Sequence, residues 1–249
     1  MPPRFFCSSL PAVSLSVSAE SGERFCTLGP DETRHARKVM RLPIGEKIEV
    51  FDGSGRLADA EILEYERGGA GGGQTQCRLG VVRESAETLP RLTVATAIPK
   101  GPRAEAMVNQ LGQLGADVLV PVQSERSVVE PGAGKVERYE KAALASAKQS
   151  GRSRLMVVEP MASLSEVLAR PSGMKLILDP RGQAMPELAD QLKAAQDVLL
   201  LVGPEGGWTE RELAEAKAAG CVRWRMAEHV LRIETAATAA VSILRYLTE

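Results

Sequence analysis

Residues 201–212 read LVGPEGGWTERE. In this stretch three glycines and one proline surround the acidic residue Glu205. The apolar residues before this stretch are typical of a buried strand, and the polar, alternating residues after its glycines are typical of a helix. Because glycine carries no Cβ, a strand-to-helix junction of this composition lets the backbone approach a ligand closely. The junction therefore predicts a ligand-binding loop, and a tight turn before a helix is the alternative.

Basic side chains gather in three places along the chain. In RHARKVMR, residues 34–41, helical spacing puts four of them on one face while Val39 and Leu42 turn away: Arg34, Arg37, Lys38 and Arg41. PKGPR holds Lys100 and Arg103, and KQSGRSR holds Lys148, Arg152 and Arg154. Each cluster alone is compatible with a solvated surface. Together they favour a phosphate-bearing partner, because phosphate contacts supply most sequence-independent affinity for nucleic acids.

The composition indicates a globular protein of one large or two modest domains. The 249 residues are 44% hydrophobic and 25% charged, with a net charge of −1, which excludes a uniformly basic surface. The apolar runs are far shorter than the roughly 20 residues of a membrane span, so no transmembrane helix and no membrane partner are expected. The N-terminal residues are interpreted as containing the first strand, with a secretory signal as the alternative.

The cysteines and histidines do not form a recognisable metal or disulfide pattern. Cys7, Cys26, Cys77 and Cys221 lie far apart without a C-x-x-C pair, and the chain has only two histidines. Neither a zinc site nor a disulfide framework is therefore predicted. The cysteines are interpreted as small buried hydrophobic residues in a protein of the reducing cytoplasm.

The pattern of strands and helices changes near residue 85. Before it, short strand-like runs are separated by the turn signals DGSG and RGGAGGGQ, which predicts the antiparallel strands of a small barrel. The glycine run 68–73 is interpreted as a hairpin tip rather than an interdomain linker. The boundary is placed at ESAETLP, which gives a first domain of residues 1–85 and a second of residues 90–249.

From residue 90 onward, apolar runs alternate with helical segments, which predicts an α/β domain with a mainly parallel sheet. Strands are expected at 92–99, 117–123, 155–160, 175–180, 198–204 and 222–227. Helices are expected at 102–114, 134–149, 185–195, from Thr209 and at the end of the chain, with a short one after residue 160. Capping boxes are predicted for Ser163 with Glu166 and for Thr209 with Glu212.

Ligands of open α/β sheets bind beyond the carboxyl ends of the strands, where LILDPRG, LVGPEGG and VLRIETAA are expected here. The chain has neither the G-x-G-x-x-G fingerprint of a dinucleotide site nor a P-loop. A nucleotide-like ligand of this chain would therefore have to bind at a site of another type.

Several of these segments together resemble a known family. GPEGG at 203–207 and LRIETA at 231–236 occur with AIPKG, SERSVV and KQSGRSR upstream, and with RFF and RHARKVMRLPIGEKIEVFDGSG near the start. This combination, spread over nearly the whole chain, resembles the RsmE family of 16S ribosomal RNA uracil-N3 methyltransferases. The resemblance implies a SPOUT α/β domain with a deep C-terminal trefoil knot and an N-terminal PUA-like β-barrel that holds RNA. It also implies S-adenosylmethionine as cofactor, 16S rRNA of the small ribosomal subunit as partner, a homodimer, and no metal.

The resemblance implies a cofactor site made of two knot loops, residues 203–207 and 231–236, with residues 178–180 as a third wall. Its residues are Leu178, Gly203, Pro204, Glu205, Gly206, Gly207, Met226, Leu231, Ile233, Thr235 and Ala236. The larger apolar side chains among them are expected to surround adenine. Two departures from the family pattern stand beside this site. The sequence has Ala227, Glu228 and His229 where a glycine-proline pair is typical, and Trp208 where a smaller hydrophobic residue is typical.

Methylation of uracil N3 requires removal or sharing of its proton and stabilisation of negative charge on the flanking carbonyl oxygens. Arg232 is the first choice for holding the uracil or a phosphate. Glu234 is interpreted as either a structural anchor or a proton acceptor, and His229 as a surface or packing residue.

Two other functions remain as alternatives to uracil-N3 methylation. The first is another SPOUT RNA methyltransferase, acting on a ribose 2′-oxygen or another base site. The second is a non-catalytic RNA-binding factor in ribosome assembly. On the last helix an apolar stripe at i, i+4, i+7 and i+8 is interpreted as either a dimer contact or intramolecular core: Ala236, Ala240, Ile243 and Leu244.

Overall fold

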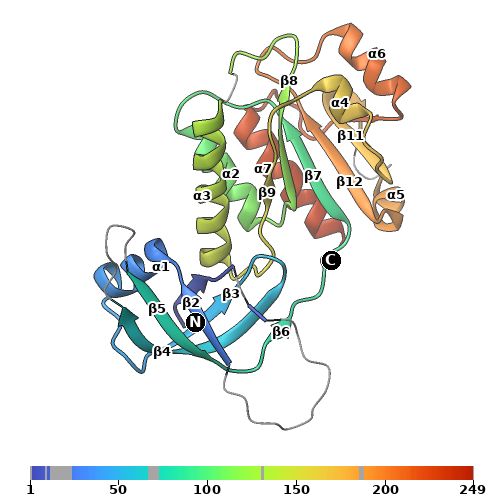
Figure 1. The fold of residues 1–249 in the computed structure, drawn as a ribbon. Helices are drawn as coiled ribbons and strands as arrows, with labels where there is room; N and C mark the ends of the chain where they lie inside the picture. The colour runs from blue at the N-terminus through green and yellow to red at the C-terminus, as the bar shows by residue number, and fades with distance from the viewer. Residues whose placement is uncertain are drawn as a thin grey trace. The chain divides into compact units, whose positions relative to one another are not determined.

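The computed structural model describes residues 2–8, 10–11, 24–66, 73–129, 132–184 and 188–248. These residues form two compact units, whose elements are labelled in Figure 1. The first unit comprises residues 1–87 and 147–155, and the second comprises residues 88–146 and 156–249. Residues 147–155 therefore cluster with the first unit, although the sequence pattern placed them in the second domain.

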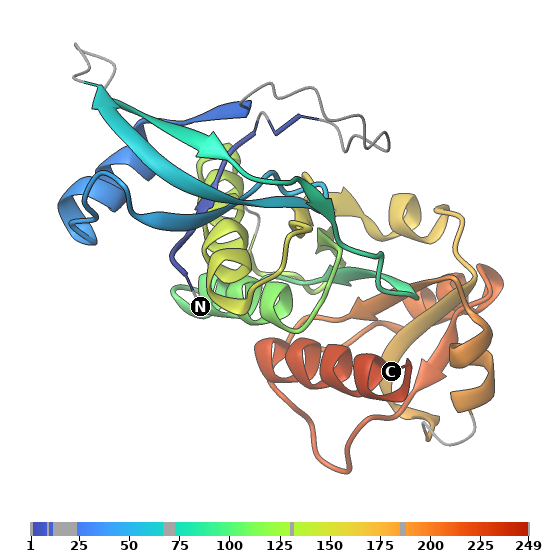
Figure 2. The ribbon, with the colours of Figure 1, turned by 90° about the horizontal axis from the view of Figure 1, so that it is seen from below.

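The first unit is a strongly curved β-sheet. Its strands are β1 Arg4–Phe6, β2 Arg24–Leu28, β3 Lys47–Phe51, β4 Arg56–Glu66, β5 Gln74–Leu79 and β6 Arg83–Glu84. The order is β1-β3-β4-β5-β2, with β6 on β4, and every pairing except β1 with β3 is antiparallel. β4 and β5 form a long twisted hairpin (Figure 2), and Glu66 pairs with Gln74 at its end. The predicted hairpin is thus confirmed, while its tip at residues 67–72 lies outside the described residues.

The core of the first unit follows the alternation of its strands. Ile48 and Val50 of β3 are buried together with three of the cysteines, Cys7, Cys26 and Cys77. A hydrogen bond with Cys7 opposes the shift, but the hydrogen bond with Cys77 and burial raise the pKa of Cys26 to about 12. All four cysteines of the chain are free and buried, which agrees with their interpretation as small hydrophobic residues.

The predicted basic stripe lies on α1 Pro30–Arg34, on the π-helical segment η1 His35–Val39, and just beyond them. Its four basic residues are all exposed: Arg34, Arg37, Lys38 and Arg41. The expectation that Val39 turns away from them is wrong, because this side chain is 66% exposed. In η1 the backbone N–H of Met40 bonds to the carbonyl of His35, five residues earlier. This wider turn changes the angular spacing on which the helical prediction rested.

The second unit is built on a parallel sheet. Its strands are β7 Arg91–Thr96, β8 Val118–Gln123, β9 Val157–Val158, β10 Ala162–Ser163, β11 Met174–Gln183, β12 Asp197–Val202 and β13 Val222–Trp224. They follow the order β10-β8-β7-β12-β11-β13, with β9 on β8, and all their pairings are parallel. The predicted parallel sheet is therefore confirmed, although β9 is shorter and β11 longer than the sequence pattern suggested.

Helices connect these strands. They are α2 Arg103–Gln113, α3 Ala133–Ser150, α4 Leu164–Leu168, α5 Ala189–Ala194, α6 Glu210–Ala218 and α7 Ile233–Thr248. Both predicted capping boxes are present: Ser163 accepts from the backbone of Glu166, and Thr209 from that of Glu212. Within the described part of the chain, no helix is long and apolar enough to cross a membrane.

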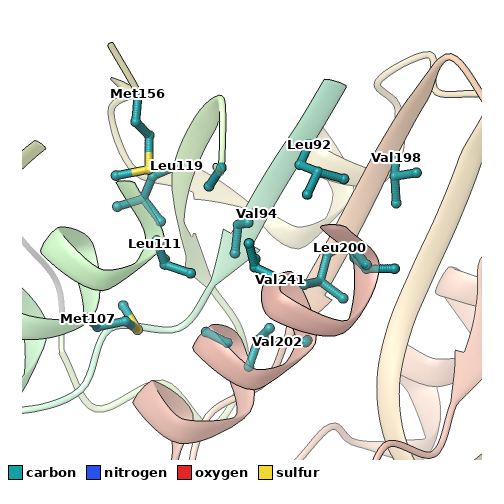
Figure 3. Packing of buried hydrophobic residues seen from close by; sticks show 14 of the residues in the cluster. Leu92, Val94, Met107, Leu111, Leu119, Met156, Val198, Leu200, Val202 and Val241 are labelled. Carbon is teal, nitrogen blue, oxygen red and sulfur yellow. The ribbon is translucent and has the colours of Figure 1, made fainter. Parts of the chain in front are cut away.

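Helices cover both faces of the parallel sheet. On one face, Leu92, Val94 and Leu200 of the strands share a core with α2 and α7 (Figure 3). On the other face, Ala95 and Leu201 pack with residues of α4 and α6. This arrangement follows from the period of two along a strand, which turns successive side chains to opposite faces.

The apolar stripe of α7 belongs to the core of the second unit. Ala240 and Leu244 are fully buried, and Ala236 and Ile243 pack against the same cluster. Of the two interpretations that the sequence left open, intramolecular core is therefore the one that the packing supports.

Candidate active site

A cavity of about 440 Å³ lies where several parallel strands end. β12 ends at Val202 and β13 at Trp224, and the loops after them line the cavity together with residues 178–181 of β11. The three segments LILDPRG, LVGPEGG and VLRIETAA thus meet at one place. All the cofactor residues expected from the resemblance line this cavity except Thr235, which is exposed on α7.

Trp208 connects two walls of the cavity. Its side chain is largely buried, and its Nε1–H donates to the carbonyl oxygen of Leu178 at 3.2 Å. A Cβ on Gly203 would lie 2.8 Å from the indole ring of Trp208. The glycine at 203 is therefore required by the protein's own tryptophan, a reason that the sequence did not reveal.

The segment SERSVV holds the same loop from another side. Nη1 of Arg126 donates to the carbonyl oxygen of Gly206 at 2.7 Å. The backbone N–H of Glu125 donates to Oε1 of Glu212 at 2.8 Å, while Oε2 of Glu212 completes the capping box with Thr209. Sequence reasoning gave residues 124–129 no role of their own, although they were part of the family resemblance.

Arg103 lies among carboxylates. One of its guanidinium nitrogens is 3.5 Å from Oε1 of Glu205, and the other is 3.4 Å from Oε1 of Glu234. Glu205 lines the cavity, whereas Glu234 is not among the lining residues. Oε2 of Glu234 is buried and has no hydrogen-bond partner within the described residues. The basic residue predicted to contact RNA is thus engaged in two ion pairs of the second unit.

Asp179 is a buried acid in the cavity wall that sequence reasoning missed. Burial alone would raise its pKa, but a hydrogen bond from the backbone N–H of Arg181 and the guanidinium of Arg223 outweigh this effect and hold the pKa below its usual range. Nη2 of Arg223 lies 2.9 Å from Oδ2 of Asp179. Asp179 therefore stays ionised, and its ion pair with Arg223 links the middle of β11 to β13.

Trp224 also lines the cavity and was not predicted to do so. Its side chain is only 1% exposed, and its indole N–H has no hydrogen-bond partner among the residues that the structure describes. An unpaired buried donor is costly unless a ligand or water satisfies it. This N–H therefore suits a ligand that carries a hydrogen-bond acceptor.

The segment before α7 contrasts with these buried groups. Val230 is 82% exposed, and His229, which also lines the cavity, is exposed too. Arg232 lies between the lining residues Leu231 and Ile233, and its exposed side chain makes no ion pair or hydrogen bond with any described residue. An unpaired guanidinium at this position is free to contact a substrate.

The remaining basic candidates differ in their surroundings. Lys100 is exposed and without a partner in the described ranges. Arg154 instead pairs with Glu84 at 3.4 Å and with Glu87 at 3.5 Å inside the first unit, and Arg152 is partly buried. Over the same ranges, no group of three or more His, Cys, Asp or Glu side chains is placed to hold a metal ion.

A parallel sheet with a strand-end cavity in the second unit, together with a PUA domain match in the first, identifies an RNA methyltransferase of the SPOUT class, as the sequence predicted. The RNA methyltransferase domain family matches residues 86–245, and the RNA methyltransferase PUA domain family matches residues 28–69. The chain belongs to the ribosomal RNA small subunit methyltransferase E family, RsmE.

Its relatives are similar over most of their length. The methyltransferase E of Synechocystis is 30% identical over 91% of this chain and 75% of the relative. That of Mycobacterium tuberculosis is 32% identical over 88% of this chain and 85% of its own. The crystal structure of the Neisseria gonorrhoeae enzyme bound to S-adenosylmethionine is 27% identical, with a TM-score of 0.86 over 99% of this chain and 98% of that one.

Proposed function

We propose that this protein transfers a methyl group from S-adenosylmethionine to N3 of a uracil in 16S rRNA of the small ribosomal subunit. The observation that carries the proposal is the meeting of LILDPRG, LVGPEGG and VLRIETAA at one cavity, in a chain of the RsmE family. The choice of uracil N3 rests on the family resemblance of the sequence motifs.

The cavity suits S-adenosylmethionine in size and chemistry. Its volume of about 440 Å³ falls within the range of small-molecule sites, about 300–1,000 Å³. Leu178, Met226 and Leu231 offer an apolar surround for adenine, and residues 203–207 offer backbone groups with little side-chain obstruction. The unpaired N–H of Trp224 is available to an acceptor on the ligand. We therefore assign these residues to cofactor binding.

The residues near Arg232 suit the chemistry of a pyrimidine base. When bound, S-adenosylmethionine supplies an electrophilic methyl group. A neutral uracil carries a proton on N3, so the site must accept this proton and stabilise charge on the neighbouring carbonyl oxygens. The unpaired guanidinium of Arg232 fits the second task, because its planar donors match two acceptors at once. For Glu234, the ion pair with Arg103 favours the role of anchor over that of proton acceptor.

RNA binding is assigned to exposed cations of both units. Lys100 and the basic residues of the first unit are available for phosphates: Arg34, Arg37, Lys38 and Arg41. Because the proposed substrate is ribosomal RNA, we propose that the enzyme acts in the cytoplasm. We also propose a homodimer, on the family resemblance alone, since the stripe of α7 is occupied within the chain.

Mass mapping of 16S rRNA nucleosides tests this function. A strain that lacks the gene is expected to lose one 3-methyluridine, and the wild-type gene is expected to restore it. The expected in vitro counterpart is transfer of labelled methyl from S-adenosylmethionine to small subunits of that strain. Loss of a 2′-O-methylated nucleoside instead, or an unchanged modification pattern, would overturn the assignment.

A further inference from the structure

We propose that Arg103 is a positioning residue that fastens the GPEGG loop to the first turn of α7 and thereby sets the affinity for the cofactor. In this role Arg103 does not contact RNA. The effect on cofactor affinity rests on the proposed function of the cavity, whereas the fastening itself is a property of the protein without ligand.

The geometry places one cation between two anions from distant parts of the chain. The guanidinium of Arg103 reaches Glu205 at 3.5 Å and Glu234 at 3.4 Å. Glu205 belongs to the loop that lines the cavity, and Glu234 belongs to the first turn of α7, which lines it through Ile233 and Ala236. Without Arg103, two carboxylates would remain, and that of Glu234 is mostly buried. Leaving a buried charge unpaired is unfavourable.

Packing fixes the helix from which the side chain of Arg103 extends. Arg103 is the first residue of α2, and Met107 and Leu111 of that helix share a core with Val241 of α7 (Figure 3). The two helices are therefore held together independently of the ion pairs. The side chain of Arg103 spans from this fixed base to the loop, so it restrains the position of Glu205 relative to α7.

The same geometry argues against the RNA role that the sequence suggested for Arg103. A phosphate would compete with two carboxylates that already occupy the guanidinium. Lys100, from the same PKGPR segment, is exposed and has no partner among the described residues. The two basic residues of one motif are thus assigned different tasks, and Lys100 provides a matched control.

The test compares Arg103→Gln with Lys100→Gln in the full chain. Calorimetry is expected to show that Arg103→Gln weakens S-adenosylmethionine binding about three- to tenfold, because two partly exposed ion pairs are lost. Hydrogen exchange without cofactor should become faster for the amides of Gly203 and of residues 205–207. The salt dependence of RNA binding should remain as in the wild type. Lys100→Gln should lower that salt dependence and leave cofactor affinity unchanged.

Arg103→Lys is expected to rescue only part of the affinity, because a single ammonium cannot reproduce the fork that reaches both carboxylates. If Arg103→Gln does not fold, Glu205→Gln removes one of the same pairs from an exposed position and should also speed exchange of the loop.

Wild-type cofactor affinity and wild-type exchange in Arg103→Gln, together with a reduced salt dependence of RNA binding, would overturn the inference. Failure of the wild-type protein to bind S-adenosylmethionine would instead contradict the proposed function. The exchange of the amides of Gly203 and of residues 205–207 would still decide whether Arg103 fastens the loop.

Discussion

Two segments of one cavity wall differ in how the protein holds them. Trp208 fixes the loop 203–208 through its packing on Gly203 and its hydrogen bond to Leu178. Arg126 holds the same loop through the carbonyl of Gly206. In contrast, residues 228–230 and Arg232 are exposed, and the side chain of Arg232 has no partner in the described structure.

The difference indicates a division of labour within the cavity. A wall that is already fixed loses little entropy when a ligand binds, which favours affinity. A segment with an unpaired guanidinium keeps its binding capacity for a second molecule. We infer that the fixed loop serves the cofactor and the exposed segment serves the RNA.

Gly203→Val breaks the fixed loop, and we expect the largest effect from it. The new side chain would collide with the ring of Trp208, since even a Cβ would lie 2.8 Å from it. Overpacking of this kind costs about 1–3 kcal/mol, and displacement of the loop should abolish measurable S-adenosylmethionine binding in calorimetry.

A matched pair of variants separates this collision from a direct clash with the ligand. Gly203→Ala should bind the cofactor poorly, and Gly203→Ala combined with Trp208→Leu should regain part of the affinity because the ring is removed. Thermal unfolding of each variant checks that it is folded. Wild-type affinity in Gly203→Ala alone would show that Trp208 does not hold the loop.

The first unit also has an exposed basic cluster, in which Arg34 lies 3.8 Å from Asp31 and Arg37 lies over the ring of Tyr65. Neutralising its exposed basic cluster should weaken RNA binding about 10- to 100-fold near 0.1 M salt, since each lost phosphate contact removes about 0.7–0.9 from the salt slope. The cluster comprises Arg34, Arg37, Lys38 and Arg41. Filter binding over a series of salt concentrations measures both quantities, and cofactor affinity should stay constant.

Arg154→Gln is the control for the exposed cluster, because Arg154 pairs with Glu84 and Glu87. This variant should lower the free energy of unfolding and leave the salt slope of RNA binding unchanged. A lower salt slope of RNA binding together with wild-type stability would instead support the predicted contact of Arg154 with RNA.

Arg232→Ala tests the exposed segment of the cavity. Single-turnover methyl transfer should slow at least tenfold, about 1.4 kcal/mol at the transition state, while cofactor affinity is retained. Arg232→Lys should restore little, because an ammonium lacks the planar pair of donors. Full uracil-N3 methylation by Arg232→Ala at saturating cofactor would make this arginine dispensable.

Asp179→Asn should have the smallest effect, on stability. Burial alone would raise the pKa of Asp179, but hydrogen bonds and the charge of Arg223 hold the pKa below its usual range. The pKa of this carboxyl is lower in the folded protein than in the unfolded chain, where it is about 3.9, so its ionisation stabilises the fold at higher pH. This stabilisation is lost as the pH falls through the folded-state pKa.

The expected loss for Asp179→Asn at pH 7 is therefore about 1 kcal/mol, reduced by the partial exposure of Arg223. Urea unfolding of the variant should also depend less on pH between about 3 and 5 than that of the wild type. Identical pH profiles would contradict the role of this ion pair.

The sequence predicted the elements whose signals are local. The alternation in β3, the continuous apolar run of β12 and the capping boxes at Ser163 and Thr209 depend on residues only a few positions apart. They could therefore be predicted without knowledge of tertiary contacts. The three cavity segments were predicted as well, because parallel strands end at one edge of a sheet.

Contacts between distant residues were not predictable in the same way. No spacing rule links Trp208 to Leu178 across 30 positions, or Arg103 to Glu234 across 131 positions. For the same reason the sequence shows the charges of Arg103 and Arg154 but not the carboxylates with which they pair. The wider turn of η1, which leaves Val39 exposed, likewise has no signal in a pattern based on 3.6 residues per turn.

The central claim is that the cavity of the second unit binds S-adenosylmethionine. Calorimetric titration of the full-length protein with S-adenosylmethionine, in buffer that contains a metal chelator, tests it most directly. Saturable binding is expected, with one site per chain and no dependence on added metal. Absence of binding to a sample shown to be folded would contradict it.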